Sequence, residues 1–236
     1  SDRVQNAGIG ACMMEKPDLT AECYRAMVEA VNIPVTIKSR IGVDKNESYD
    51  FFYNFISTLF DAGCRHFYIH ARNAILKGLT PRQNREVPPL KYEYVTKIQS
   101  DFEGAHFFIN GGIKTLKEAQ QLLKSYEGVM LGRLAYKNPM LLHDLEKKIF
   151  ETQPIDILKI ISIYREYMEK ENSSGTPIRY MARHLQGLFH GIPQAAQYRR
   201  EINEIMIQTS PKASDLDPVI ANLKTNLEKK YAKQAI

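Results

Sequence analysis

Two glycine-containing turns have residue types suited to binding an anion. Asn110, Gly111 and Gly112 follow one short apolar segment, and Gly132 and Arg133 follow the next. Glycine lets the backbone approach a ligand, and a helix start offers unpaired N–H groups to an anion. Two such turns in succession predict a phosphate site, at which Arg133 would add a charge-assisted hydrogen bond. The alternative for Arg133 is an ordinary surface arginine.

Lys38 and His70 are the other candidates for chemistry. Lys38 has three functional interpretations: a Schiff-base nucleophile, a contact to a substrate anion, or a cation beside a flavin ring. The alternative is a buried ion pair with a neighbouring acid. His70 is either a satisfied core histidine or a ligand contact, and its predicted closeness to Lys38, Arg40 and Asn110 favours the contact. These residues alone do not select a cofactor.

The elements that would position these residues are short apolar strands alternating with amphipathic helices. Helical patterns between them end on glycines, as helices commonly do, and Thr115 with Glu118 has the spacing of a capping box. Strand, helix and strand in succession predict a parallel sheet. The four predicted strands are 34–40, 66–72, 106–112 and 128–133.

The alternation of side chains within the strands favours a barrel over an open sheet. Val35 and Ile37 share one face of the first strand, whereas Lys38 and Arg40 share the other. Helices outside and a polar inner mouth give this pattern in a (β/α)8 barrel, while an open doubly wound sheet is apolar on both faces. The predicted class is α/β, the C-terminal half of such a barrel, with four further strands expected before Ser1.

After Phe150 the pattern becomes helical throughout. The segment 151–157 predicts a linker, and the predicted domains are 1–150 and 151–236, the second a small all-α bundle. Its four expected helices span about 155–171, 177–190, 194–208 and 215–232. One face of the second carries an apolar stripe, namely Ile178, Met181, Leu185, Leu188 and Phe189. The opposite face, with Arg179, Arg183, Gln186 and His190, is a solvated surface or an RNA backbone contact.

Composition limits the class of protein. The chain has 236 residues, 44% hydrophobic and 25% charged, and a net charge of +5, which is typical of a globular protein. It has no apolar run long enough to span a bilayer and no signal-peptide pattern, so we expect a cytoplasmic protein. Cys12, Cys23 and Cys64 show no disulfide or metal-ligand spacing, and no metal site is predicted. Two stretches, 64–85 and 172–200, contain basic residues without acids, and each is a solvated face or a nucleic-acid surface.

Several longer motifs identify a family. The chain resembles the tRNA-dihydrouridine synthases, in particular their A-type branch, through SDRVQNAGIGACMM, PVTIKSRIGVD, IHARNAILKGLTPRQNREVPPL, INGGIKT, GVMLGRLAYKNP and RHLQGLFHGIPQAAQYRR. This resemblance implies an FMN-dependent barrel with a helical C-terminal domain, which reduces uridine in the tRNA D-loop with NADPH, at positions 20 and 20a. It also implies tRNA as the partner and no membrane; the sequence does not determine the oligomeric state, and a monomer is the expectation.

The resemblance also assigns site residues by position. The implied FMN contacts are Lys38, His70, Asn110, Gly111, Gly112, Gly132 and Arg133. Arg82 and Arg85 match positions that meet tRNA, and Arg199 with Arg200 lies in the helix that helps to select the uridine. Ala196, one turn earlier, differs from the basic residue of some relatives.

The implied reaction passes a hydride from the flavin to uracil C6 while a cysteine protonates C5. That cysteine belongs to an N-x-G-C-P-S motif whose serine matches Ser1, so we expect it two residues before Ser1 and no catalytic residue in this chain. Cys12 is interpreted as a packed thiol. We therefore expect the chain alone neither to retain FMN nor to reduce uridine.

Two other hypotheses remain open. One is an FMN barrel that acts on a small pyrimidine, as a dihydroorotate-type dehydrogenase does; it does not explain the basic helical region. The other is an RNA-binding module or a product of truncation. Half a barrel has open sheet edges and should be poorly soluble alone, which disfavours this second hypothesis.

Overall fold

The computed structural model describes residues 5–153, 155–190 and 194–234, with side chains as far as 225. Three predictions fall partly outside the described residues: Ser1, Pro154 of the predicted linker, and residues 191–193 of the motif RHLQGLFHGIPQAAQYRR. The chain divides into two compact units, Ser1–Leu131 and Gly132–Ile236, ahead of the boundary predicted at residue 150.

The first unit is built on a parallel sheet, as predicted. Strands β1 (Ile37–Ser39), β2 (His66–His70), β3 (His106–Asn110) and β4 (Gly128–Met130) pair in the order β1-β2-β3-β4. All four are shorter at their C-terminal ends than the apolar segments predicted. After β3 the cause is conformational, because Gly111 and Gly112 have φ values of 115° and 74°, which end the extended backbone.

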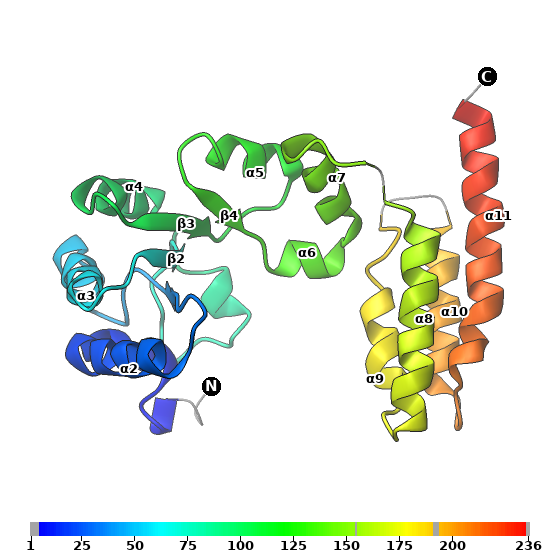
Figure 1. Ribbon diagram of the computed structural model, residues 1–236, viewed down its shortest axis with the longest axis horizontal. Helices are drawn as coiled ribbons and strands as arrows, with labels where there is room; N and C mark the ends of the chain where they lie inside the picture. The colour runs from blue at the N-terminus through cyan, green and yellow to red at the C-terminus, as the bar shows by residue number, and fades with distance from the viewer. Residues whose placement is uncertain (1–4, 154, 191–193, 235–236) are drawn as a thin grey trace. The chain divides into compact units, whose positions relative to one another are not determined.

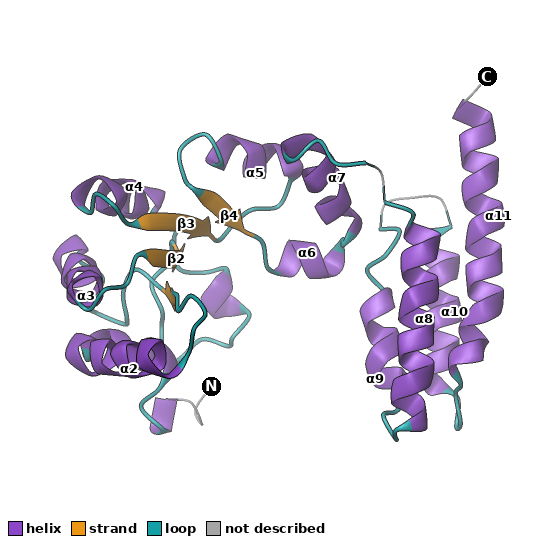
Figure 2. Ribbon diagram, in the orientation of Figure 1, coloured by secondary structure: helices purple, strands orange, loops and turns teal. Residues whose placement is uncertain are grey.

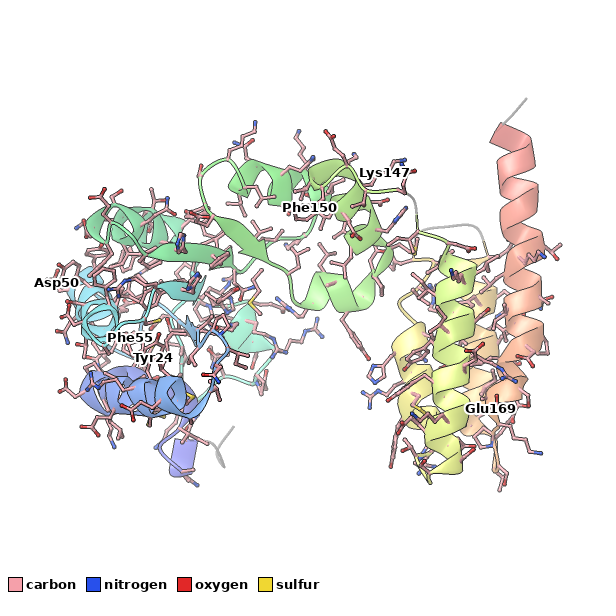
Figure 3. The ribbon with its side chains drawn as sticks, in the orientation of Figure 1. Tyr24, Asp50, Phe55, Lys147, Phe150 and Glu169 are labelled. Carbon is pink, nitrogen blue, oxygen red and sulfur yellow. The ribbon has the colours of Figure 1, made fainter. Side chains whose placement is uncertain are left out.

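Helices cover one face of this sheet (Figure 1). They are α2 (Pro17–Ala30), α3 (Tyr49–Asp61), α4 (Tyr92–Asp101) and α5 (Leu116–Leu122). Phe67, Ile69 and Phe107 point from the strands into this layer and are fully buried. Tyr24 on α2 and Phe55 on α3 are also buried, and they lie near each other where the two helices pack (Figure 3). The predicted apolar face is therefore the helix-covered face.

The opposite face of the sheet is polar and aromatic. Lys38 is exposed there, and the half-buried rings of Tyr68 and Phe108 stack with their centroids 4.5 Å apart. At the N-terminal end of the strands His66 stacks on His106 at 4.9 Å. The alternation predicted from the sequence is confirmed on β1 and β2.

The second unit contains only helices and turns among its described residues (Figure 2). Its helices are α6 (Arg133–Lys137), α7 (Met140–Ile149), α8 (Ile157–Ser173), α9 (Ile178–Ala182), α10 (Ala195–Ile207) and α11 (Asp217–Gln234). Short 3-10 helices, η3 (Arg183–Leu185) and η4 (Ala213–Leu216), follow α9 and precede α11. Each of the four predicted segments contains a helix.

The second predicted helix, 177–190, is much shorter in the structure. It changes from α to 3-10 geometry at Arg183, and Phe189 has a φ of 61°. Its apolar stripe is nevertheless buried in the core of the second unit, as predicted. Because the helical period changes at Arg183, the predicted basic face is not continuous: Gln186 is half-buried and donates to Asn203 Oδ1 at 2.5 Å.

In the described part of the chain, no helix is both long and apolar enough to cross a bilayer.

Candidate functional site

The turn after β3 is held tightly against neighbouring side chains. A Cβ atom built on Gly111 would lie 2.6 Å from Cδ2 of His70, and one on Gly112 would lie 2.4 Å from Cδ1 of Leu90. Both positions also have positive φ, so a side chain would be strained as well as crowded. The glycines therefore allow the backbone to pack closely against side chains of the protein itself, above all against the ring of His70.

Hydrogen bonds from the neighbouring strand and helix fix this turn further. His70 and Asn110 are register partners at the ends of β2 and β3. The Asn110 side-chain amide donates to the carbonyl of Met130 at 2.7 Å, and the Tyr92 hydroxyl donates to the Gly111 carbonyl. The structure therefore brings together three residues predicted from the sequence, namely His70, Asn110 and Gly111, in one rigid edge of the sheet.

The capping box predicted at the start of α5 is confirmed. The Thr115 hydroxyl accepts from Glu118 N, and the Glu118 carboxylate accepts from Lys114 N at 2.6 Å and Thr115 N at 2.9 Å. These bonds lower the pKa of Glu118, the bond from Lys114 N having the largest effect. An anion at this turn would compete with Glu118 for these two N–H groups, and contact of an anion with the first turn of α5 stays a prediction.

Lys38 lies on the open face of β1, beside Tyr68 of β2. The residue as a whole is exposed, yet neighbouring atoms partly desolvate its ammonium group. This desolvation, followed by the positive charge of Arg40, lowers the pKa of Lys38. Among the described residues no ion pair includes Lys38, so the interpretation as a buried ion pair finds no partner.

Gly132 and Arg133 belong to the second unit, where both are exposed. Gly132 precedes α6, a helix of five residues, and a Cβ atom on it would meet nothing within 4 Å. The described structure thus gives this glycine no packing role, in contrast with Gly111. Whether it joins the first turn in one phosphate site stays a prediction.

The loop after β2 carries the arginines assigned to tRNA. Arg82 and Arg85 are exposed on or beside the 3-10 helix η2 (Gln83–Arg85), and Arg82 makes an exposed ion pair with Glu86 at 3.6 Å. Such pairs contribute little to stability, so Arg82 can exchange its partner readily. The loop borders a cavity of about 700 Å³ whose wall includes Arg40, Asn84 and Cys12.

Sequence reasoning missed Asn84 and the role of Arg40 in this loop. Asn84 bonds the main chain of Ile75, nine positions earlier, and Arg40 bonds the carbonyls of Asn73 and Asn84. No periodicity or motif signals such contacts, because their partners are backbone groups. Cys12, predicted to be a packed thiol, is half-buried on η1 (Gly10–Glu15).

The second pair of arginines lies on α10 in the second unit. Arg200 is exposed and Arg199 is half-buried, while Ala196 is exposed one turn earlier. The same helix buries Tyr198 and Ile202 in the core of this unit, so its opposite side faces outward. An outward basic pair is available for an anionic partner, and its role stays a prediction.

Comparison with known proteins identifies the family. The sequence model of the family "Dihydrouridine synthase (Dus)" matches residues 1–228. The chain belongs to the dihydrouridine synthase family. The resemblance stated from the motifs is therefore confirmed over nearly the whole chain.

Several curated relatives are similar over most of this chain. The tRNA-dihydrouridine(20/20a) synthase of Yersinia pestis is 47% identical over 207 residues, which cover 86% of this chain and 60% of that protein. The synthase of the same name from Vibrio cholerae serotype O1 is 48% identical and covered to 63%, and that of Salmonella typhi is 44% identical over 223 residues and covered to 67%. The chain thus spans about two thirds or less of the length of these relatives. A solved dihydrodipicolinate synthase from Oceanobacillus iheyensis matches 92% of this chain and 80% of its own at 12% identity and a TM-score of 0.32, from which nothing follows here.

Proposed function

We propose that the protein carrying this chain is an FMN-dependent tRNA-dihydrouridine synthase. It would reduce uridine at positions 20 and 20a of the tRNA D-loop, with NADPH as the electron source. The four βα units of the first unit would form half of a (β/α) barrel, and the helical region would serve as a tRNA-binding domain. The similarity to tRNA-dihydrouridine(20/20a) synthases supports the substrate, and the arrangement of the residues at the sheet edge supports the cofactor.

The observation that carries the cofactor proposal is the arrangement of one sheet face. Helices cover the other face, so Lys38, His70 and the turn from Asn110 to Gly112 are gathered at one open edge. These residues fit a flavin phosphate and ring system: an exposed ammonium, an imidazole held against a glycine turn, and main-chain N–H groups in a left-handed turn that can face an anion. When bound, FMN would supply the hydride that reduces the uracil C5–C6 double bond.

The residues of this chain would bind and orient. Lys38 would place positive charge beside the flavin, and partial desolvation, which lowers its pKa, makes its ammonium group less hydrated than that of a surface lysine. His70, fixed against Gly111, would contact the cofactor at a defined place. Gly132 and Arg133 would hold the phosphate. No residue of the chain is assigned as the proton donor to C5.

The RNA would be held by basic side chains of both units. Arg82 and Arg85 are exposed in the first unit, and Arg200 is exposed in the second. Arginine forms paired hydrogen bonds with phosphate, and such contacts position a nucleic acid without reading its sequence. The target uridine must leave its stack to reach a flavin in a protein pocket.

The test uses the full-length protein, loaded with FMN and reduced by NADPH. We expect oxidation of the flavin to depend on tRNA that lacks dihydrouridine, with mass spectrometry locating the product at positions 20 and 20a. Free uridine and uracil are the competing substrates in the same assay. Turnover of the free pyrimidines without turnover of tRNA would overturn the proposal.

Binding experiments separate the two groups of residues. Lys38→Met should weaken FMN binding, followed by flavin fluorescence, and leave the tRNA affinity unchanged. Arg200→Gln should do the reverse. The matched controls are Lys45→Met and Arg25→Gln, which change exposed residues outside both groups.

A further inference from the structure

Arg40 joins two ends of the loop that follows β2. It lies just after β1, and its Nη1 donates to the carbonyl of Asn73 at 3.2 Å and to the carbonyl of Asn84 at 3.1 Å. These acceptors are eleven positions apart in the sequence but are bridged by one guanidinium nitrogen. Arg40 is half-buried and comes from a different βα unit, so it ties the loop to the sheet.

Asn84 closes the same loop from within. Its Oδ1 accepts from Ile75 N at 3.1 Å, and its Nδ2 donates to the Ile75 carbonyl. The side chain therefore satisfies both backbone groups of one residue, as a neighbouring strand would. A further bond, from Gln5 Nε2 to the Leu76 carbonyl at 2.5 Å, holds the outer side of the loop.

This arrangement gathers positive charge at an electrostatic cost. Burial, followed by the charges of Arg72 and Arg85, lowers the pKa of Arg40 to about 10. The two carbonyl contacts compensate part of this cost, because a carbonyl oxygen is the negative end of a dipole. A neutral hydrogen-bond donor could bridge the same two carbonyls without the repulsion.

Of the arginines expected to meet RNA, Arg82 lies between the bridged ends and Arg85 lies directly after one of them. Arg82 follows Pro81 at the tip, and Arg85 follows Asn84 directly. Thr80 and Gln83 are bonded to each other through the Gln83 carboxamide oxygen and the Thr80 hydroxyl, which fixes the turn that presents Arg82. These local bonds shape the tip of the loop, and the bonds of Arg40 and Asn84 join its two ends.

We propose that Arg40 and Asn84 are positioning residues that clamp the segment 73–85 and so hold Arg82 and Arg85 ready for the RNA backbone. The inference rests on the proposed function in one respect, that the ligand of these arginines is tRNA. A flexible segment would have to be ordered at the moment of binding. Immobilising long side chains costs binding free energy, so loss of the clamp for two arginines should raise KM for tRNA about tenfold, which corresponds to about 1.4 kcal/mol. The value of kcat should change little, since the clamp acts through binding.

The experiment compares Arg40→Met, Asn84→Ala and the double variant of the full-length protein. The first readout is tryptic cleavage after Lys77 and Arg82, both exposed in the clamped loop, followed by mass spectrometry. The second is KM and kcat with tRNA. The matched control is Arg65→Met, because Arg65 Nη1 also donates to two carbonyls, those of Phe60 at 2.6 Å and Cys64 at 2.9 Å, at the other end of β2.

We expect both single variants to speed cleavage at the two loop sites and to raise KM for tRNA, and the double variant to show less than the product of the two effects. Arg65→Met should leave both readouts unchanged. If cleavage is not faster, the clamp is wrong. If cleavage is faster but KM is unchanged, the clamp exists and the role in RNA binding is refuted.

Two further outcomes are decisive. If Arg40→Met does not fold, Asn84→Ala, which removes the other closure of the loop, takes its place under the same criteria. If the unsubstituted protein does not act on tRNA at all, the proposed function fails, and with it the RNA role; the cleavage rates then decide the clamp alone.

Discussion

Replacing Gly111 by alanine tests whether the turn after β3 positions His70. The added Cβ would lie 2.6 Å from His70 Cδ2, 3.0 Å from its Nε2 and 3.1 Å from Cδ2 of Leu90. Real Cβ atoms do not approach so closely, so the imidazole ring must move or the turn must open. Either change disturbs the edge at which we place the cofactor.

The magnitude has two parts. The φ of Gly111 is 115°, and a side chain in such a conformation costs about 1–3 kcal/mol. Overpacking against His70 and Leu90 adds about 1–3 kcal/mol. Gly63→Ala is the matched control, because Gly63 has a φ of 101° in the same unit but a Cβ there meets nothing within 4 Å. The control therefore has the cost of the positive φ but not the cost of overpacking.

The assays are urea unfolding followed by far-UV circular dichroism, and FMN affinity from quenching of flavin fluorescence. We expect Gly111→Ala to reduce the free energy of unfolding by about 1–3 kcal/mol more than Gly63→Ala does, since only the former crowds its neighbours. We also expect only Gly111→Ala to weaken FMN binding. Equal losses of stability with equal FMN affinities would refute the role assigned to the contact with His70.

Three further predictions concern stability. Because the fold lowers the pKa of Lys38, its protonated form destabilises the folded state below that pKa, and the penalty fades as pH rises toward the ordinary lysine value of about 10.4; Lys38→Met should therefore raise Tm at neutral pH by a margin that narrows in alkali, and a constant margin would contradict this. Gly187→Ala places a Cβ 2.5 Å from the Tyr136 carbonyl oxygen, and calorimetry should show a loss of about 1–3 kcal/mol, whereas an unchanged Tm would exclude the close packing. Tyr198→Phe removes the buried bond from the phenol to the Leu185 carbonyl at 3.0 Å and should cost about 1 kcal/mol, with Tyr180→Phe, at an exposed site, as the neutral control.

The pattern of apolar residues was sufficient for the elements of the fold. Alternation on β1 and β2 predicted the helix-covered face, and the spacing of Thr115 and Glu118 predicted the capping box; both were confirmed. These succeed because burial and capping depend on residues within a few positions of one another. The second predicted helix was too long because Arg183 begins a 3-10 turn that apolar spacing does not distinguish from an α-helix.

The parts of the site that were missed depend on distant backbone groups. Asn84 bonds the backbone of Ile75, and Arg40 bonds two backbone carbonyls of the next βα unit. Every residue has such backbone groups, so the residue types do not reveal these contacts. The basic stretch 64–85 indicated the arginines of the loop, but it did not indicate the hydrogen bonds that hold the loop in place. Similarly, the glycine at 187 has its reason in the carbonyl of Tyr136, which no local pattern marks.

The two glycine turns consequently support a phosphate site with different strength. Gly111 would be required for packing against His70 even in a protein without a cofactor, and two N–H groups of the following capping box are already bonded to Glu118. Gly132 has neither a steric contact nor a positive φ to require it. A glycine that local packing does not demand is the one whose small size points to close approach by another molecule. Gly132, with Arg133 beside it, therefore stays a candidate for contact with an anion, and Gly111 acts within its own unit by fixing the imidazole of His70.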